Sequence, residues 1–472
     1  MEKPFIKLFR SPNANYFYDV GKNDIIRIPE KVYIHLHAVL SGTSVLEHPD
    51  DNDVLPIIES LIELGYLSVK RPERIKHSAT EMVPLLLNRC IDKITLQLTQ
   101  ECNFRCKYCI YSEKKNHKQR SHANHNMTID TAKKAILFYR SHAIDSSIYN
   151  VGLYGGEPLL RWNLIKEIIL FAEAELGGKL LTFSLTTNAS LITEPMAAFL
   201  EEHNVSVLVS MDGIKQINDA NRVFQDGHGT TDVVLANLQM IHDRHPKLFA
   251  DFQISSVITP ETDPTLFSQF PYELNDIPIE SYMMSIEDNT DHDVVLPADL
   301  RKTMENLTFQ AFLSELGLFS QPLTPYGYGQ VKSLQNKLKA IKITNGMQEV
   351  TSPSGPCIPG KTRLFITVDG RLFPCERVNE TDEYCIGSLD VGLDTEKAKK
   401  MLNIGSITEE ACKQCWAMRH CIICCKYFDY SSENAAVEKL KHCNSVRLSA
   451  EKTIRAAIML SEMKSFYKDI VN

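Results

Sequence analysis

The sequence predicts an α/β protein whose central part is built from parallel βα units. Three observations lead to this prediction. Short apolar strands alternate with amphipathic helices between residues 91 and 310, a small unit of strands and helices precedes them, and nine of the 13 cysteines fall between Cys357 and Cys443. An alternation of strands and helices favours a parallel sheet, in which ligands gather at the C-terminal ends of the strands.

Residues 1–75 are expected to fold as a unit of their own. Residues 16–20 and 25–28 are β-prone runs that read as a hairpin. Pro29 opens the first of two helices, and residues 66–69 read as a further short strand. The order of hairpin, helices and strand is winged-helix-like.

The remainder of the chain divides by composition and periodicity. We expect a linker at 76–90, the βα units at 91–310, a bridging region at 311–352, a cysteine-rich region at 353–445 and a C-terminal helix at 446–472. Strands are expected at 94–99, 147–154, 181–186, 205–210, 252–258 and 282–285, with helices at 130–139 and 163–174 among those between them. Residues 295–350 show no clear pattern.

Composition and charge narrow the classes of function. A net charge of −8 gives no general attraction to phosphate backbones or anionic lipid, so neither a nucleic acid nor a membrane is an expected partner. No apolar run is long enough to cross a bilayer, and the N-terminus lacks the hydrophobic stretch of a secretory signal. We therefore expect a cytoplasmic protein.

Cysteines in such a compartment stay reduced, so their clustering indicates metal ligation more than disulfides. Cys102, Cys106 and Cys109 form one tight triplet, and its spacing lets three thiolates converge from one loop while a fourth cluster position has no protein ligand. A zinc site that lacks one ligand is the alternative interpretation. Cys90 lies outside every pattern and is expected to be a structural thiol.

The triplet, with Tyr108 before its last cysteine, resembles the signature loop of the radical S-adenosylmethionine (radical SAM) enzymes. The resemblance implies a partial (β/α)6 barrel of the TIM type, and a [4Fe–4S] cluster whose open iron binds SAM and reduces it to a 5′-deoxyadenosyl radical. Further residues that match SAM-binding motifs of this family are Tyr108, Gly155, Gly156, Glu157, Pro158, Thr187, Asn188, Ser210, Asp212 and Arg222. Glu157 is expected to accept a hydrogen bond from the SAM amino group.

The C-terminal cysteines resemble a SPASM domain, which holds two auxiliary [4Fe–4S] clusters, so the resemblance implies three clusters in all. It implies that Cys357, Cys375 and Cys425 ligate auxiliary cluster I, and that Cys412, Cys415, Cys421 and Cys443 ligate auxiliary cluster II. Related chains often carry a further cysteine just before the position of Cys357, and this chain has none there. Either Cys385 or Cys424 fills the gap, or the site stays open for a substrate thiolate, which is the alternative that we favour.

As a whole the chain resembles maturases of ribosomal peptides, in particular the ranthipeptide group of the freyrasin and SCIFF type. The resemblance implies thioether links from cysteine sulfur to a side-chain carbon, a precursor peptide with a leader and a cysteine-rich core, and a flavodoxin or ferredoxin as electron donor. It also implies that residues 1–75 bind the leader. Glu376 stands where some relatives carry an acidic general base.

Other functions stay open on the sequence. The rivals among enzymes are synthases of α-carbon thioethers (sactipeptides), carbon–carbon cross-linking maturases and sulfatase-type maturases. A non-catalytic iron–sulfur redox sensor is an alternative of a different class.

Overall fold

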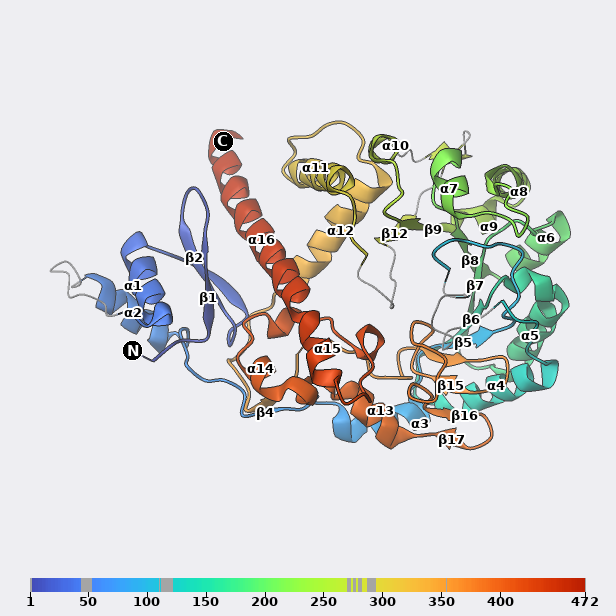
Figure 1. Cartoon of the computed structure of the whole chain (residues 1–472), viewed down its shortest axis with the longest axis horizontal. Coiled ribbons are helices and arrows are strands. Elements are labelled where there is room, and N and C mark those ends of the chain that lie inside the picture. Colours follow the sequence, from blue (N-terminus) through green and yellow to red (C-terminus); the bar gives the residue numbers. More distant parts are fainter. Residues whose placement is uncertain are drawn as a thin grey trace.

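The computed structural model describes residues 2–43, 53–109, 111, 122–269, 273–274, 277–278, 282–286, 294–353 and 355–471. Figure 1 shows three parts along the longest axis. A small N-terminal unit lies at the left, the βα units lie at the right, and the cysteine-rich segment with the long helix α16 (Cys443–Val471) lies between them.

An eight-stranded sheet forms the right-hand part, in the order β12-β9-β8-β7-β6-β5-β14-β15. Its strands are β5 (Ile94–Gln97), β6 (Ile148–Tyr154), β7 (Leu180–Thr187), β8 (Val205–Ser210), β9 (Gln253–Ile258), β12 (Tyr282–Ile286), β14 (Leu364–Ile366) and β15 (Leu372–Phe373). All neighbouring pairs are parallel except β14 and β15. Six of the parallel strands, β5, β6, β7, β8, β9 and β12, lie side by side in chain order. The edge strands β12 and β15 do not pair with each other, so the sheet does not close into a complete barrel. The predicted central parallel sheet is confirmed.

Helices pack outside this sheet, as Figure 1 shows for α4, α5 and α6. The helices of this part are α4 (Ile129–His142), α5 (Trp162–Glu175), α6 (Glu194–Glu202), α7 (Lys215–Asn221), α8 (Thr231–Arg244), α9 (Pro246–Ala250), α10 (Pro264–Ser268), α11 (Ala298–Glu315) and α12 (Pro325–Ala340), with the 3-10 turn η3 (Pro158–Arg161) and the short pair β10 (Glu273–Leu274) and β11 (Ile277–Pro278). Thr128 caps α4, because its Oγ1 accepts a hydrogen bond from Thr131 N. Residues 295–350, which showed no clear pattern, contain α11 and α12.

The strands β14 and β15 come from the cysteine-rich segment and extend the barrel sheet beyond β5. Leu364 of β14 pairs with Ile94 of β5, and the two strands run parallel. No strand was predicted between 353 and 445, because each of these strands is only two or three residues long. Their position matters for the site, since it carries Glu376 and Arg377, just past β15, to the inner side of the barrel.

The N-terminal unit has a three-stranded antiparallel sheet, β1 (Ile6–Arg10), β2 (Asn15–Asp19) and β3 (Asp24–Ile28), followed by α1 (Glu30–Ser41) and α2 (Val54–Glu63). The hairpin and both helices agree with the prediction, whereas β1 was not expected. The strand predicted at 66–69 is wrong. Gly65 and Leu67 have φ angles of 82° and 59° in the left-handed region, which an extended strand excludes.

Both faces of β2 are buried. Phe17 faces α1 and α2, where it packs with Val32 and Leu36. Tyr16 and Tyr18 point the opposite way, into a cluster that also contains buried side chains of the cysteine-rich region and of α16. The N-terminal sheet is therefore attached to the cysteine-rich region through its central strand.

The segment 76–90, predicted to be a linker, contains the 3-10 turn η2 (Thr80–Met82) and the helix α3 (Val83–Arg89). Val83 and Leu87 are fully buried against α13 (Thr395–Leu402), and this burial stabilises the helix α3. The expected boundary at 310 falls inside α11.

The cysteine-rich region consists mainly of short elements. They are β13 (Val350–Thr351), which pairs with β4 (Arg74–Ile75), the pair β16 (Gly387–Ser388) and β17 (Gly392–Leu393), and α13 (Thr395–Leu402), η4 (Ile404–Thr408), α14 (Glu409–Lys413), η5 (Met418–His420), η6 (Cys425–Tyr427) and α15 (Ala435–Lys441). None of the helices in the described ranges is both long and apolar enough to span a bilayer.

Candidate functional site

The cysteine triplet lies in the loop that follows β5, at the C-terminal end of the sheet. Cys106 is buried, and Cys102 and Cys109 are half-buried. Backbone amides approach two of the sulfurs, with Phe104 N at 3.3 Å from Cys102 Sγ and Tyr111 N at 3.4 Å from Cys109 Sγ. Such N–H groups stabilise thiolate ligands.

Burial, together with the nearby Glu157 carboxylate, raises the pKa of Cys102 to about 12, and burial raises the pKa of Cys106 to about 11. Without a metal these thiols hold their protons at neutral pH, so the loop needs a strong Lewis acid to carry thiolates. The three sulfurs line one cavity, whose described wall has no other cysteine. This donor set fits a cluster with one open position.

Gly155 and Gly156 connect the end of β6 to the cysteine loop. A Cβ on Gly155, where φ is 151°, would lie 2.4 Å from Thr99 O, and one on Gly156 would lie 2.0 Å from Glu101 O. Gly156 N and Glu157 N donate hydrogen bonds of 2.8 Å to these two carbonyl oxygens. The glycines therefore allow the protein's own loop to approach closely, and their contact with SAM stays a prediction. Pro158 follows as the first residue of η3.

The Glu157 side chain is only 1% exposed and is engaged by the protein. Its Oε1 accepts hydrogen bonds from Leu159 N (3.0 Å) and Thr187 Oγ1 (2.7 Å), and its Oε2 accepts one from Asn188 N (2.7 Å). Burial raises its pKa to about 7, although these hydrogen bonds act in the opposite direction. Glu157 thus ties the end of β6 to the end of β7, and the predicted bond to the SAM amino group would be an additional one.

Tyr108, Asp212 and Arg222 form a buried group behind Cys106. Tyr108 OH donates to Asp212 Oδ2 at 2.6 Å, and Arg222 Nη2 lies 3.1 Å from Asp212 Oδ1. Burial alone would lower the pKa of Arg222, but the neighbouring Asp212 carboxylate raises it, so the guanidinium stays protonated. Arg222 lines the cavity and Asp212 lies behind it. The predicted contacts of both residues with SAM remain predictions.

Thr187, Asn188 and Ser210 line the same cavity at the ends of β7 and β8. Asn188 Nδ2 donates to Asn103 Oδ1 at 2.9 Å, which ties the end of β7 to the cysteine loop. Asn103 was not predicted, although its place between Cys102 and Cys106 could have indicated it.

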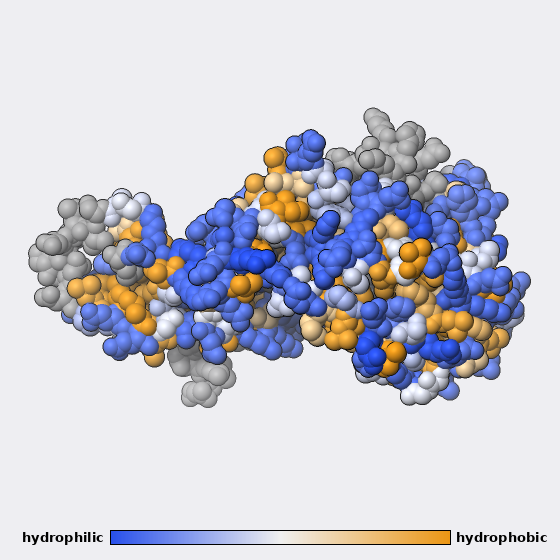
Figure 2. Space-filling model, turned by 90° about the horizontal axis from the view of Figure 1, so that it is seen from below, coloured by the Kyte–Doolittle hydropathy of each residue, from blue (hydrophilic) through white to orange (hydrophobic). Residues whose placement is uncertain are grey.

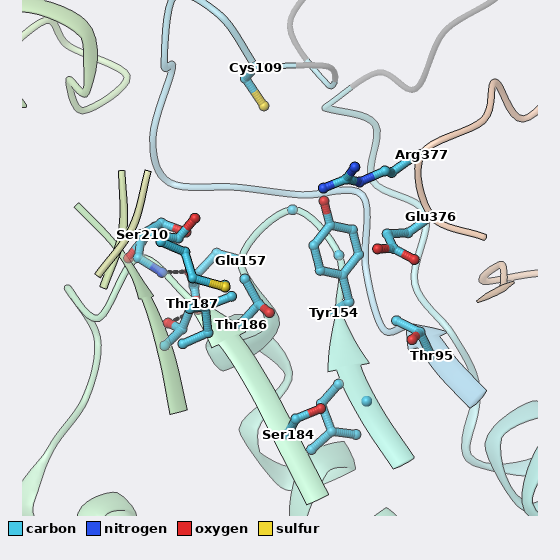
Figure 3. Close-up of a pocket in the computed structure, with 18 of the residues that line it drawn as sticks. Thr95, Cys109, Tyr154, Glu157, Ser184, Thr186, Thr187, Ser210, Glu376 and Arg377 are labelled. Atoms are coloured by element: carbon cyan, nitrogen blue, oxygen red, sulfur yellow. Dashed lines mark hydrogen bonds between the residues drawn. The ribbon is translucent and has the colours of Figure 1, made fainter. Parts of the chain in front are cut away.

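The cavity has a volume of about 840 Å³ and extends along the inner face of the sheet. Figure 3 shows Cys109 above one side of it and Glu376 and Arg377 on another. Hydroxyl-bearing residues on successive strands point inward and line it, namely Thr95, Ser184, Thr186, Ser206, Ser255 and Ser285. These hydroxyl groups could form hydrogen bonds with the backbone of a bound peptide.

Charged residues line the part of the cavity near the N-terminal ends of β5 and β14. Lys93 Nζ donates to Ser184 Oγ at 2.9 Å, and burial lowers its pKa. Arg363 forms an ion pair with Glu376, whose side chain is 17% exposed. Lys93 and Arg363 were not predicted. The signal for Lys93 was its position directly before a strand whose alternate residues face the barrel interior.

Cys357, Cys375 and Cys425, the three residues predicted for auxiliary cluster I, lie near one another together with Cys424. Burial raises the pKa of Cys425 well above its usual value, and the neighbouring Cys424, Cys375 and Cys357 raise it further. Cys385 contacts a different part of the chain, because its Sγ lies 3.1 Å from Gly387 O in the β16–β17 pair. Of the two cysteines that could fill the fourth position, Cys424 is the one beside the others.

The four cysteines predicted for auxiliary cluster II surround a second, small cavity. Cys412, Cys415, Cys421 and Cys443 all line it, together with Lys439 and Arg447. Burial raises the pKa of Cys421 to about 11. Within the described ranges no three metal-ligating side chains are close enough together to hold a single metal ion. The four sulfurs line the wall of the cavity instead. Four thiols around one cavity fit the predicted cluster.

Comparison with known proteins identifies the central part of the chain. Residues 96–264 match the family model described as the radical SAM superfamily. The chain is 25% identical over 239 residues to the radical SAM cyclopropyl synthase TigE of Paramaledivibacter caminithermalis, a match that covers 48% of each chain. The chain thus spans about half the length of TigE, and 55% of that of an archaeal relative that is 31% identical over 173 residues.

A longer match is to the cysteine-type anaerobic sulfatase-maturating enzyme of Clostridium perfringens, with 23% identity over 372 residues, 73% of this chain and 91% of the relative. The structure of the enzyme named anSMEcpe, solved with bound AdoMet, superposes with a TM-score of 0.58 at 19% identity, and covers 78% of this chain and 99% of that one. A segment of the chain thus matches the radical SAM superfamily, and most of the chain is similar to a cysteine-type anaerobic sulfatase-maturating enzyme.

Proposed function

We propose that the chain is a radical SAM maturase that oxidises a cysteine-containing peptide and joins the cysteine sulfur to a carbon of another residue. The observation that carries this proposal is the single cavity along the barrel. Its wall includes Cys102, Cys106 and Cys109 on one side, and Glu376 and Lys426, the residues that follow Cys375 and Cys425, on another. A peptide in the cavity would touch the surroundings of two clusters at once.

Bound at the cysteine loop, a [4Fe–4S] cluster with SAM would supply a 5′-deoxyadenosyl radical that removes one hydrogen atom from the peptide. The chain's own residues would then hold and shelter the peptide. The inward hydroxyl groups can bond its amides, and the cavity restricts access of water. Glu376 is placed on the cavity wall where it can accept the thiol proton, and its ion pair with Arg363 keeps it oriented.

A closely related function is oxidation of a cysteine without a cross-link, as in a sulfatase-type maturase. The similarity to cysteine-type anaerobic sulfatase-maturating enzymes over most of the chain favours this candidate. One of those enzymes has been solved with AdoMet and a peptide named Kp18Cys. The position of Cys424 also bears on the choice, because a fourth protein ligand would leave no site on auxiliary cluster I for a substrate thiolate.

Leader recognition by the N-terminal unit forms part of the proposal. The ends of β1 are already engaged, since Phe5 N donates to Ser68 O and Arg455 donates to Arg10 O. An added peptide strand would therefore pair with β3. Exposed apolar side chains on and beside α1 and α2 offer further contacts, and Figure 2 shows hydrophobic residues at this left-hand end of the molecule. The electron donor and the cytoplasmic location stay predictions.

The test is anaerobic reaction of the reconstituted protein with SAM, a reductant and candidate cysteine-containing peptides. Formation of 5′-deoxyadenosine that disappears in Cys102→Ala would support the radical step, whereas an iron–sulfur redox sensor would form none. Mass spectrometry then separates the functions. A thioether loses two hydrogens and one alkylatable thiol, a sulfatase-type product loses sulfur, and a carbon–carbon link retains the thiol. Fragmentation distinguishes attachment at the α-carbon from attachment at a side chain.

A further inference from the structure

Helix α15 is oriented with a lysine inside and two aliphatic residues outside. Lys439 is 2% exposed, whereas Val437 and Leu440 on the same helix are 58% and 43% exposed. Apolar burial would favour the opposite orientation, because a charged amine loses its hydration when it is buried. A specific interaction must compensate for the burial of Lys439.

The contacts of the ammonium group identify its surroundings. Lys439 Nζ donates to Thr408 Oγ1 at 2.6 Å and lies 3.4 Å from Gly405 O and 3.5 Å from Cys412 Sγ. Among the residues that the structure describes, no carboxylate forms an ion pair with it. Two neutral oxygens do not balance a buried positive charge.

The remaining neighbours are sulfurs. Lys439 lines the small cavity that Cys412, Cys415, Cys421 and Cys443 surround. Its Nζ lies 3.5 Å from Cys412 Sγ, on the wall of that cavity. Four thiolates on a cluster held in this cavity would supply the negative charge that the buried ammonium otherwise lacks.

We infer that Lys439 is the built-in counter-charge of auxiliary cluster II and that it raises the reduction potential of this cluster. The inference rests on the proposed ligation by the four cysteines. A [4Fe–4S] cluster with four thiolates has a net negative charge that grows by one on reduction, so a fixed cation beside one sulfur stabilises the reduced form more than the oxidised form. A hydrogen bond from the ammonium to a ligand sulfur acts in the same direction.

The consequence concerns the electron that is left when the peptide product forms. With Lys439 in place, auxiliary cluster II is easier to reduce than it would be beside a neutral side chain, so it can accept this electron before an external electron carrier removes it. Lys439 would thus act on the reduction potential of the cluster and would not contact the peptide.

The test is a potentiometric titration of the anaerobically reconstituted protein, followed by electron paramagnetic resonance. Lys439→Met removes the charge and the hydrogen bonds, Lys439→Gln replaces the ammonium with a neutral, shorter amide donor, and Lys439→Arg keeps the charge. We expect both neutral variants to lower the equilibrium constant for one-electron reduction of auxiliary cluster II at least tenfold, which corresponds to about 59 mV. Lys441→Met is the matched control, since Lys441 lies on the same helix but is exposed and paired with Glu438.

An unchanged potential in a neutral variant that keeps the cluster would overturn the inference. Loss of this cluster in both neutral variants but not in Lys439→Arg would support the inference. Loss of the cluster in all three variants would contradict it, because Lys439 would then matter for packing and not for its charge. A wild-type protein that contains no third cluster would refute the proposed ligation instead, and iron and sulfide content reveals that case before any variant is made.

Discussion

The close approach of the β6 turn to the cysteine loop makes Gly156→Ala a severe change. The added Cβ would lie 2.0 Å from Glu101 O, and an ordinary contact begins at 3.4 Å, so the two backbone segments must separate by 1.4 Å. The hydrogen bonds Gly156 N to Thr99 O and Glu157 N to Glu101 O, both 2.8 Å, would then break. Two lost hydrogen bonds and the overpacking together cost about 3–5 kcal/mol.

Cys102 directly follows Glu101, so the shift moves the first of the three predicted cluster ligands. We expect Gly156→Ala to lower the denaturation midpoint and to bind less iron after anaerobic reconstitution. Gly177→Ala is the control, because no atom lies within 4 Å of its added Cβ. Equal stability and iron content in the two variants would show that the loop does not depend on this close approach.

Three further predictions concern the pH dependence of stability, the fourth cluster ligand and the cavity. Burial raises the pKa of Glu157 from 4.5 to about 7, so the folded state keeps this proton to a higher pH than the unfolded state does. The free energy of unfolding should therefore fall by up to about 3 kcal/mol as pH rises through this window. Glu157→Gln should remove this pH dependence, and a variant whose denaturation curves still show it would assign the effect to another group. Cys424→Ser should lose auxiliary cluster I iron and Cys385→Ser should retain it, as measured by iron content and paramagnetic resonance; the reverse order would show that Cys385 is the ligand. Lys93→Met removes a charged donor from the cavity wall, so KM for the peptide should rise about tenfold while uncoupled SAM cleavage stays unchanged; altered cleavage without a change in KM would contradict a role in peptide binding.

The sequence predicted the parts of the fold that local periodicity determines. The helices α4 and α5 and the strands β5, β6, β7, β8, β9 and β12 lie within a few residues of the predicted bounds, whereas the short pair β10 and β11 was not predicted. The strand at 66–69 failed because its apolar residues are interrupted by left-handed backbone at Leu67, which composition does not reveal.

The sequence predicted only those parts of the site in which the spacing between cysteines is itself informative. The triplet and the four cysteines of the second set each line one cavity, and their ligation of clusters stays a prediction. The choice between Cys385 and Cys424 depends on loops that meet only in the folded chain, and so do the hydrogen bonds that engage Glu157. Lys439 offered no signal, because a lysine on a short polar helix is ordinarily at the surface.

Trp416, one of two tryptophans in the chain, stands between Cys415 and Cys421 and packs edge-on against the N-terminal sheet. Its ring centroid is 6.2 Å from that of Phe9 and 6.5 Å from that of Tyr18. An indole at this junction is a native fluorophore that is sensitive to movement of β2, and the proposed auxiliary cluster II would quench its emission. Emission spectroscopy of the unlabelled protein could therefore follow both metal loading and the arrival of a leader.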